Sequence, residues 1–173
     1  MGQLAHIERT YGPQTLEAGL RSLDAEDQEH LAGMVSLSWV PVGSVQRYKA
    51  AVAERLSMHP DQLQREAVRA SIGAMLNTVW RVLLRTVSDS ALIKRTPILY
   101  GKTFDRGRLS TEAIGSGYAS IVLEGWPGIP EYDCLGLATG IEAVLQYAGR
   151  HDARLTWKRT STQVRFTARW TAF

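Results

Sequence analysis

Residues 163–170 read Gln163-Val164-Arg165-Phe166-Thr167-Ala168-Arg169-Trp170 and alternate apolar and polar side chains more regularly than any other part of the chain. Successive side chains of a β-strand point to opposite faces of its sheet, so this stretch predicts a strand with one buried face and one exposed face. We expect the strand to extend from Gln163 to Phe173.

The segments before this strand predict the rest of an antiparallel sheet. A period of two indicates strands at 109–115 and 119–126, joined by a turn at Gly115-Ser116-Gly117, and another strand at 153–159. Between them, apolar residues at helical spacing predict a helix from about Glu131 to Ala148. The part from about 106 to 173 is therefore expected to have the order β-β-α-β-β.

The first part of the chain has helical spacing instead. The expected helices cover about 13–23, 44–58, 60–84 and 88–99, with Ser44 capping the second and Pro97 kinking or ending the last. Residues 70–84 are apolar nearly all round, which predicts a buried central helix. We expect one α+β domain over 1–173, with a helical half at about 1–105 packed on a four-stranded antiparallel sheet.

Composition limits the classes of function. No apolar run approaches the roughly 20 residues of a membrane span, and the N-terminus lacks a secretory pattern, so we expect a cytoplasmic protein. The net charge is +3, but the basic residues are scattered among acidic ones, so nucleic acid is not an expected partner. The one cysteine, Cys134, supports neither an internal disulfide nor a zinc cluster.

The order of elements resembles the haem nitric-oxide-binding domain superfamily, whose relatives include vinyl-reductase domains and small subunits of the TRAPP vesicle-tethering complex. The chain is most similar to an uncharacterised domain family of myxobacteria. The stretches that carry this likeness are Tyr11-Gly12-Pro13, Trp39-Val40-Pro41, Leu135-Gly136-Leu137 and the closing 165–170 strand. The resemblance spans nearly the whole chain and implies a ligand-binding or sensory module.

The haem site that the resemblance implies is not matched by the residues. Haem iron needs an axial ligand such as histidine, but Ser90-Ala91-Leu92-Ile93 holds none where haem-binding relatives carry one. Those relatives hold the haem propionates with a Tyr-x-Ser-x-Arg motif. Tyr118-Ala119-Ser120-Ile121-Val122 has valine at the arginine position, and valine cannot pair with a carboxylate. We expect no haem, no metal and no other cofactor.

No set of residues predicts catalysis. The four histidines are not spaced as metal ligands, and Cys134 lies on the apolar stripe of its helix, as a small buried side chain does. The carboxylate pairs lie near helix starts, where negative charges interact favourably with the positive end of the helix dipole. We therefore do not expect an enzyme.

Two hypotheses remain. The first is a ligand-binding or sensory module with an apolar pocket between helices and sheet, suited to a small apolar or acyl ligand. Its expected lining residues are Trp80, Leu84, Leu99, Tyr100 and Ile141. The second is a homodimeric protein-interaction or assembly module with a filled core, which would act through an exposed apolar patch on the helical half.

Overall fold

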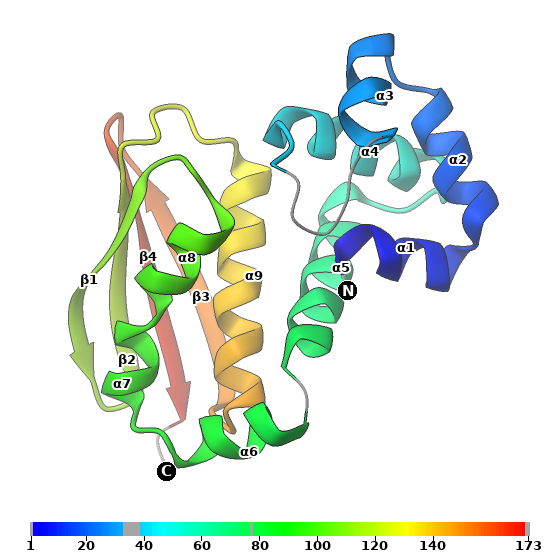
Figure 1. Cartoon of the computed structure of the whole chain (residues 1–173). Coiled ribbons are helices and arrows are strands. Elements are labelled where there is room, and N and C mark those ends of the chain that lie inside the picture. The colour runs from blue at the N-terminus through cyan, green and yellow to red at the C-terminus, as the bar shows by residue number, and fades with distance from the viewer. Residues whose placement is uncertain (1, 33–38, 77, 172–173) are drawn as a thin grey trace. The chain divides into compact units, whose positions relative to one another are not determined.

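The computed structural model describes residues 2–32, 39–76 and 78–171, except for the side chains of 78–81. The chain forms two compact units, Met1–Met75 and Leu76–Phe173 (Figure 1). The first unit ends well before residue 105 because, of the segments that follow Met75, residues 89–94 and 96–103 pack on the sheet and residues 78–86 pack on the helix at 131–147. The expectation of a single domain stays a prediction.

Helices alone build the described part of the first unit: α1 Gln3–Tyr11, α2 Pro13–Arg21, α3 Ala25–Ala32, α4 Val42–Arg55 and α5 Pro60–Met75. Gly12, with φ of 86°, turns the chain between α1 and α2, a conformation that favours glycine. The core consists of Ile7, Leu31, Tyr48, Val52, Ala53, Leu63 and Ala67. Its side chains come from four helices, each of which contributes one apolar face.

An ion pair between a buried carboxylate and a partly exposed arginine joins α3 to α4 within this unit. Asp27 is 1% exposed, and its carboxylate accepts hydrogen bonds from Nε and Nη2 of Arg47. Ser44, the residue that the sequence places at the cap of this helix, is also buried. The helix begins earlier, at Val42, because Pro41 takes the cap position with extended backbone. Ser44 instead lies beside Asp27 and His30.

The second unit begins with three short helices and continues as predicted. The helices are α6 Thr78–Thr86, α7 Asp89–Lys94 and α8 Thr96–Thr103, and they precede β1 Arg108–Gly115, β2 Tyr118–Glu124, α9 Glu131–Tyr147, β3 His151–Arg159 and β4 Gln163–Thr171. The four strands form one antiparallel sheet in the order β1-β2-β4-β3. The predicted α+β class and the β-β-α-β-β order are confirmed. The last two residues of the predicted final strand, 172 and 173, lie outside the described residues.

The helix predicted over 60–84 is wrong in its length and its burial. Two helices, α5 and α6, take its place, and α5 ends at Met75. Asn77 and Thr78 are weak helix formers, which favours an interruption there. Met75, Val82 and Leu83 are all about half exposed, so an apolar composition on all sides does not make this segment a buried central helix.

The two faces of the sheet differ in character. One face is apolar and packs against α7, α8 and α9, as Figure 1 shows; its strand residues include Leu109, Ile121, Leu123, Leu155, Val164, Phe166 and Ala168. We call the opposite face the polar sheet face. It is formed by Arg108, Ser110, Glu112, Tyr118, Ser120, Val122, Glu124, Arg154, Thr156, Lys158, Gln163, Arg165, Thr167 and Arg169. All of them except Glu112 pair with one another across the strands. Glu112 lies at the bulge of β1 and reaches Ser120 and Arg165 of this face with its carboxylate. This division follows from the period of two.

Candidate apolar binding groove

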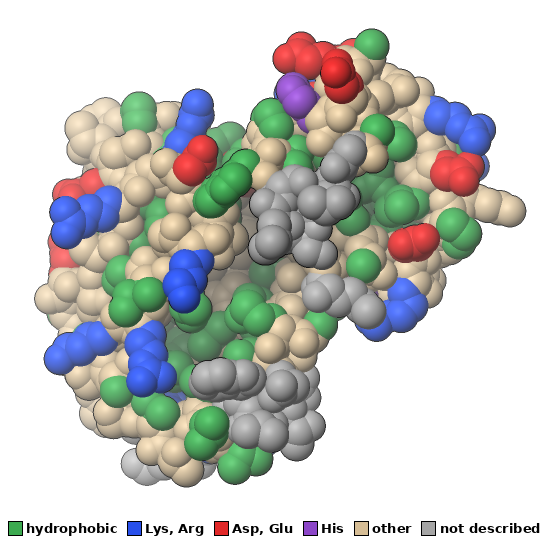
Figure 2. Space-filling view, viewed as in Figure 1, with side chains coloured by type: hydrophobic (Ala, Val, Ile, Leu, Met, Phe, Trp, Pro, Cys, Tyr) green, Lys and Arg blue, Asp and Glu red, His purple; other side chains and the backbone are tan. Residues whose placement is uncertain are grey.

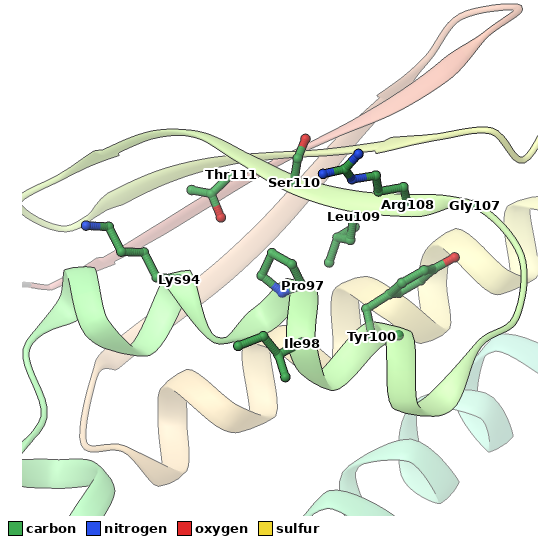
Figure 3. A pocket seen from close by; sticks show the side chains of 10 residues that line it. Lys94, Pro97, Ile98, Tyr100, Gly107, Arg108, Leu109, Ser110 and Thr111 are labelled. Carbon is green, nitrogen blue, oxygen red and sulfur yellow. The ribbon is translucent and has the colours of Figure 1, made fainter.

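A groove runs between α8 and the edge strand β1 within the second unit (Figure 3). Its volume is about 500 Å³, which is within the range of small-molecule sites. The lining residues that matter are Lys94, Pro97, Ile98, Tyr100, Leu109 and Thr111. They come from two neighbouring parts of the chain, because the chain turns after α8 and β1 then runs back beside that helix.

Strand alternation decides which residues of β1 enter the groove. In Figure 3, Leu109 and Thr111 point toward the helices, whereas Arg108 and Ser110 point to the other side of the strand. On the helical side, Pro97 and Ile98 lie opposite Leu109. Ile98, which also lines the groove, is 62% exposed, so an apolar side chain of the lining is open to solvent. Such a surface gains free energy when an apolar ligand covers it.

Tyr100 forms the other end of the groove and is fixed by its own contacts. Its ring stacks on Phe104 at 5.0 Å between centroids, and Phe104 packs on Trp126 at 5.9 Å. The Tyr100 hydroxyl donates a hydrogen bond of 2.5 Å to the carbonyl oxygen of Arg106. Burial raises the pKa of Tyr100, so this hydroxyl stays neutral. The stacked and hydrogen-bonded Tyr100 ring therefore forms a rigid wall at this end of the groove.

Polar groups gather at the end of the groove that is opposite Tyr100. Thr111 Oγ1 is buried and has no hydrogen-bond partner among the described residues. A buried hydroxyl without a partner costs free energy, which a ligand that hydrogen-bonds to it would recover. Lys94, at the C-terminal end of α7, is exposed and also lines this end. The groove is therefore amphipathic along its length.

Of the five lining residues predicted from the sequence, only Tyr100 lines this groove. Leu99 neighbours it on α8 and is exposed, Leu84 lies half-buried on α6, and Ile141 is buried on α9. Trp80 belongs to α6, but its side chain lies outside the described residues. The expectation that these five form one ligand site stays a prediction.

Sequence reasoning did not select Ile98, Leu109 or Thr111 as ligand contacts. A signal was present, because the alternation of the 109–115 strand places Leu109 and Thr111 on the same face as the helices. The sequence marks Pro97 only as a breaker of a helix, but it lies in the first turn of α8, where proline is well tolerated. The proximity of α8 to β1 could not be read from either pattern alone.

The comparisons concern the whole chain. A scan against models of protein families and a search of curated proteins return no match. Solved structures do match. An Fe(II) unliganded H-NOX protein from K. algicida has a TM-score of 0.73 and 10% identity, with 99% of this chain and 94% of that chain covered. An oxygen-binding H-NOX domain related to soluble guanylate cyclases has a TM-score of 0.62 and 12% identity, covering 97% of this chain and 90% of that one.

A third similar structure, from work on haem distortion in the H-NOX family, has a TM-score of 0.65 and 12% identity over 97% of this chain and 90% of that chain. These matches confirm the predicted resemblance: this chain has the fold of the H-NOX domains. At such low identity the likeness establishes the fold, and the chemistry of the site must come from the residues present here.

The residues present do not fit haem. The helices before the sheet, α7 and α8, contain no histidine. His6 and His30 lie in α1 and α3, and His59 and His151 are exposed. No group of three His, Cys, Asp or Glu side chains suited to a metal occurs among the described residues. Cys134 is buried in α9, and desolvation raises its pKa to about 11, which disfavours a thiolate ligand.

The segment that corresponds to the propionate-binding motif, 118–122, has its polar side chains engaged by other residues of the same sheet. Tyr118, Ser120 and Val122 lie on the polar sheet face, where Val122 pairs with Arg165 of β4. Ser120 Oγ donates to Glu112 Oε2 at 3.2 Å, and the Arg165 guanidinium donates to both oxygens of the same carboxylate. The serine and the arginine paired with Val122 thus bind an internal carboxylate, so this segment is not prepared for a haem propionate.

Proposed function

We propose that this chain is a non-enzymatic ligand-binding or sensory module that acts in the cytoplasm and holds a small apolar or acyl compound rather than haem. The groove between α8 and β1 is the proposed site. The single observation that carries the proposal is the buried, unpartnered Thr111 hydroxyl at the polar end of an open apolar groove.

This arrangement suits an amphiphile. An aliphatic or aromatic body would cover Pro97, Ile98 and Leu109, and a carboxylate or hydroxyl would meet Thr111 and Lys94 at the other end. The lysine ammonium is a mobile point charge and adapts to several anionic head groups. The fit to H-NOX domains supports the same class of function, because the related oxygen-binding domain holds a small ligand.

The test uses the full chain and decanoate as the probe. Native mass spectrometry of the purified protein shows whether a small molecule is retained, and titration with decanoate gives the affinity. Ile98→Glu places a charge in the apolar lining of the groove and should weaken decanoate binding at least tenfold. Leu83→Glu makes the same kind of change on α6, outside the groove, and should leave binding unchanged.

Thr111→Val tests the polar end. This variant removes the hydroxyl and keeps the shape, so it should weaken binding of decanoate while leaving the affinity for an apolar probe such as decane within twofold. Equal effects of Ile98→Glu and Leu83→Glu, or no binding of either probe, would contradict the proposed site. Soret absorption of the purified protein would contradict the haem-free proposal.

One observation favours the alternative of a homodimeric assembly module. Val82, Leu83, Ile98 and Leu99 are 45–62% exposed, and Figure 2 shows hydrophobic side chains at the surface over α6 and α8. Exposed apolar side chains of this size are typical of contact surfaces. A ligand-free dimer in native mass spectrometry, converted to monomer by Leu83→Glu, would favour this second function.

A further inference from the structure

The polar sheet face is covered by no described helix of its own unit. The helices α7, α8 and α9 pack on the apolar face, as Figure 3 shows with the sheet seen from its edge. On the polar sheet face, Arg154, Lys158, Arg165 and Arg169 point to solvent from the neighbouring strands β3 and β4. Glu112 and Glu124 are the acidic side chains of the same face.

The register brings like charges directly opposite each other twice. Arg154 pairs with Arg169, and Lys158 pairs with Arg165. Like charges in such cross-strand positions destabilise a sheet. A sequence selected for stability alone would place an acidic residue at one member of each pair, as β1 does with Glu112 toward Arg165.

The other three cations have no carboxylate partner among the described residues. The Arg169 guanidinium lies over the ring of Tyr118, 5.5 Å from its centroid, and Arg154 Nη1 reaches only the backbone oxygen of Ala153 at 3.3 Å. No ion pair involves Lys158 in the described structure. Thr156 and Thr167, which pair with each other between the two cationic pairs, add hydroxyl groups to the patch.

The spacing of the patch is fixed by the sheet. Arg165 and Arg169 are four residues apart on β4, which is roughly 13 Å at about 3.3 Å per residue. Neighbouring strands lie about 4.8 Å apart, so the four cations mark the corners of a narrow rectangle. An extended or helical acidic segment with several carboxylates matches an elongated target of this kind.

We infer that this cationic patch, Arg154, Lys158, Arg165 and Arg169, docks an acidic segment of a partner protein. Arginine side chains bind carboxylates with two parallel hydrogen bonds, which suits the Asp and Glu side chains of a partner protein. Single-stranded nucleic acid would need aromatic rings for base stacking, but Arg169 already covers Tyr118. A membrane surface would need apolar side chains for insertion, and Val122 is buried.

The experiment uses the full chain and an acetylated, amidated peptide of five Glu-Ser repeats, measured by fluorescence anisotropy at 50 mM and 300 mM salt. We expect Arg154→Gln/Lys158→Gln/Arg169→Gln to weaken binding about tenfold at low salt, because each exposed ion pair contributes a few-fold. The matched control, Arg55→Gln/Lys102→Gln/Arg106→Gln, removes the same charge from exposed positions off the sheet face and should change binding less than twofold.

Two further readouts separate docking from a structural role. Because the triple variant relieves both like-charge pairs, its urea midpoint at low salt should equal or exceed that of the parent chain. A lower midpoint would mean that the cations hold the sheet together, which contradicts the inference. Equal losses in the two triple variants, or tighter binding of a ten-residue oligothymidylate or of phosphatidylserine vesicles than of the peptide, would also overturn it.

Discussion

Arg150 Nε donates a hydrogen bond of 2.8 Å to Asp89 Oδ1 and so joins the turn between α9 and β3 to the first residue of α7. The Arg150 side chain is 5% exposed and also donates to the carbonyl oxygens of Leu84, Val87 and Ala148. Asp89 Oδ2 accepts from the Trp170 indole at 2.9 Å. One ion pair therefore connects α6, α7, β4 and the turn after α9 within the second unit.

Asp89→Ala should destabilise the second unit by about 2–3 kcal/mol, because it leaves the Arg150 charge buried without its counterion. The value lies at or below the lower end of the range for fully buried pairs, since Asp89 is 27% exposed. Urea unfolding followed by tryptophan fluorescence measures the change. Asp105→Ala, at an exposed position, is the matched control and should change stability little; equal effects of the two variants would count against the network.

Acid should weaken the first unit through Asp27. Hydrogen bonds from Arg47 first, and from Ser44 second, lower the pKa of Asp27 from 3.8 to about 2. A carboxyl group whose pKa is lower in the folded state contributes its stability above about pH 4, and that contribution is lost as pH falls toward 2. Urea midpoints between pH 6 and pH 2 should fall less steeply in Asp27→Asn than in the parent chain. Glu17→Gln, which breaks an exposed pair with Arg21, should keep the parent's slope.

The thiol of Cys134 should be inert in the folded protein. Burial raises its pKa to about 11, so at pH 8 almost no thiolate forms and a disulfide reagent reacts only after unfolding. The raised pKa also contributes stability that is complete below pH 9 and is lost as pH rises toward 11. The rate of reaction with the reagent should follow the unfolded fraction in urea; rapid labelling of the native chain would show that the thiol is accessible.

Ile141→Arg should unfold or strongly destabilise the second unit, by more than about 3 kcal/mol, because Ile141 is buried and a charge there would have no water. Gln146→Arg introduces the same charge at an exposed position in the last turn of α9. A cation there interacts favourably with the negative end of the helix dipole. Thermal unfolding compares the two. Similar melting temperatures would mean that α9 does not present Ile141 to the interior.

Gly19→Ala and Gly101→Ala should have opposite signs. A Cβ at Gly19 would lie 2.6 Å from Val52 Cγ2, so α2 and α4 would have to separate, at a cost of about 1–3 kcal/mol. A Cβ at Gly101, in α8, meets nothing within 4 Å and should stabilise the helix by about 0.5–1 kcal/mol. Denaturation in urea measures both, and a stabilising Gly19→Ala would refute the close approach of α2 to α4.

The sheet was predictable because its signals are local. The alternation of 163–170 matches the buried and exposed residues of β4. The 60–84 segment failed for a different reason. Its apolar residues predicted burial, but Val82 and Leu83 remain exposed, because hydrophobicity gives a tendency to be covered and does not specify the covering element.

The candidate groove was predictable only in part. Tyr100 is among the lining residues expected from the sequence, but Leu109, which lines the same groove, is expected only as a strand residue. The contact between α8 and β1 depends on the turn through Gly107, where φ is 70° and a Cβ would lie 2.9 Å from Leu123 Cδ1 and from the Glu124 carbonyl oxygen. No periodicity in the sequence reports such a close approach.

The sequence by itself determined the α+β class, the order of strands along the chain and which side chains share a face, because these depend on periods of two and 3.6 residues within one segment. The tertiary structure alone decided that Arg154 meets Arg169, that Arg150 meets Asp89 and that Thr111 faces α8. Each of these relationships joins residues from different segments, and strand register and helix packing set them through the free energy of the whole assembled core.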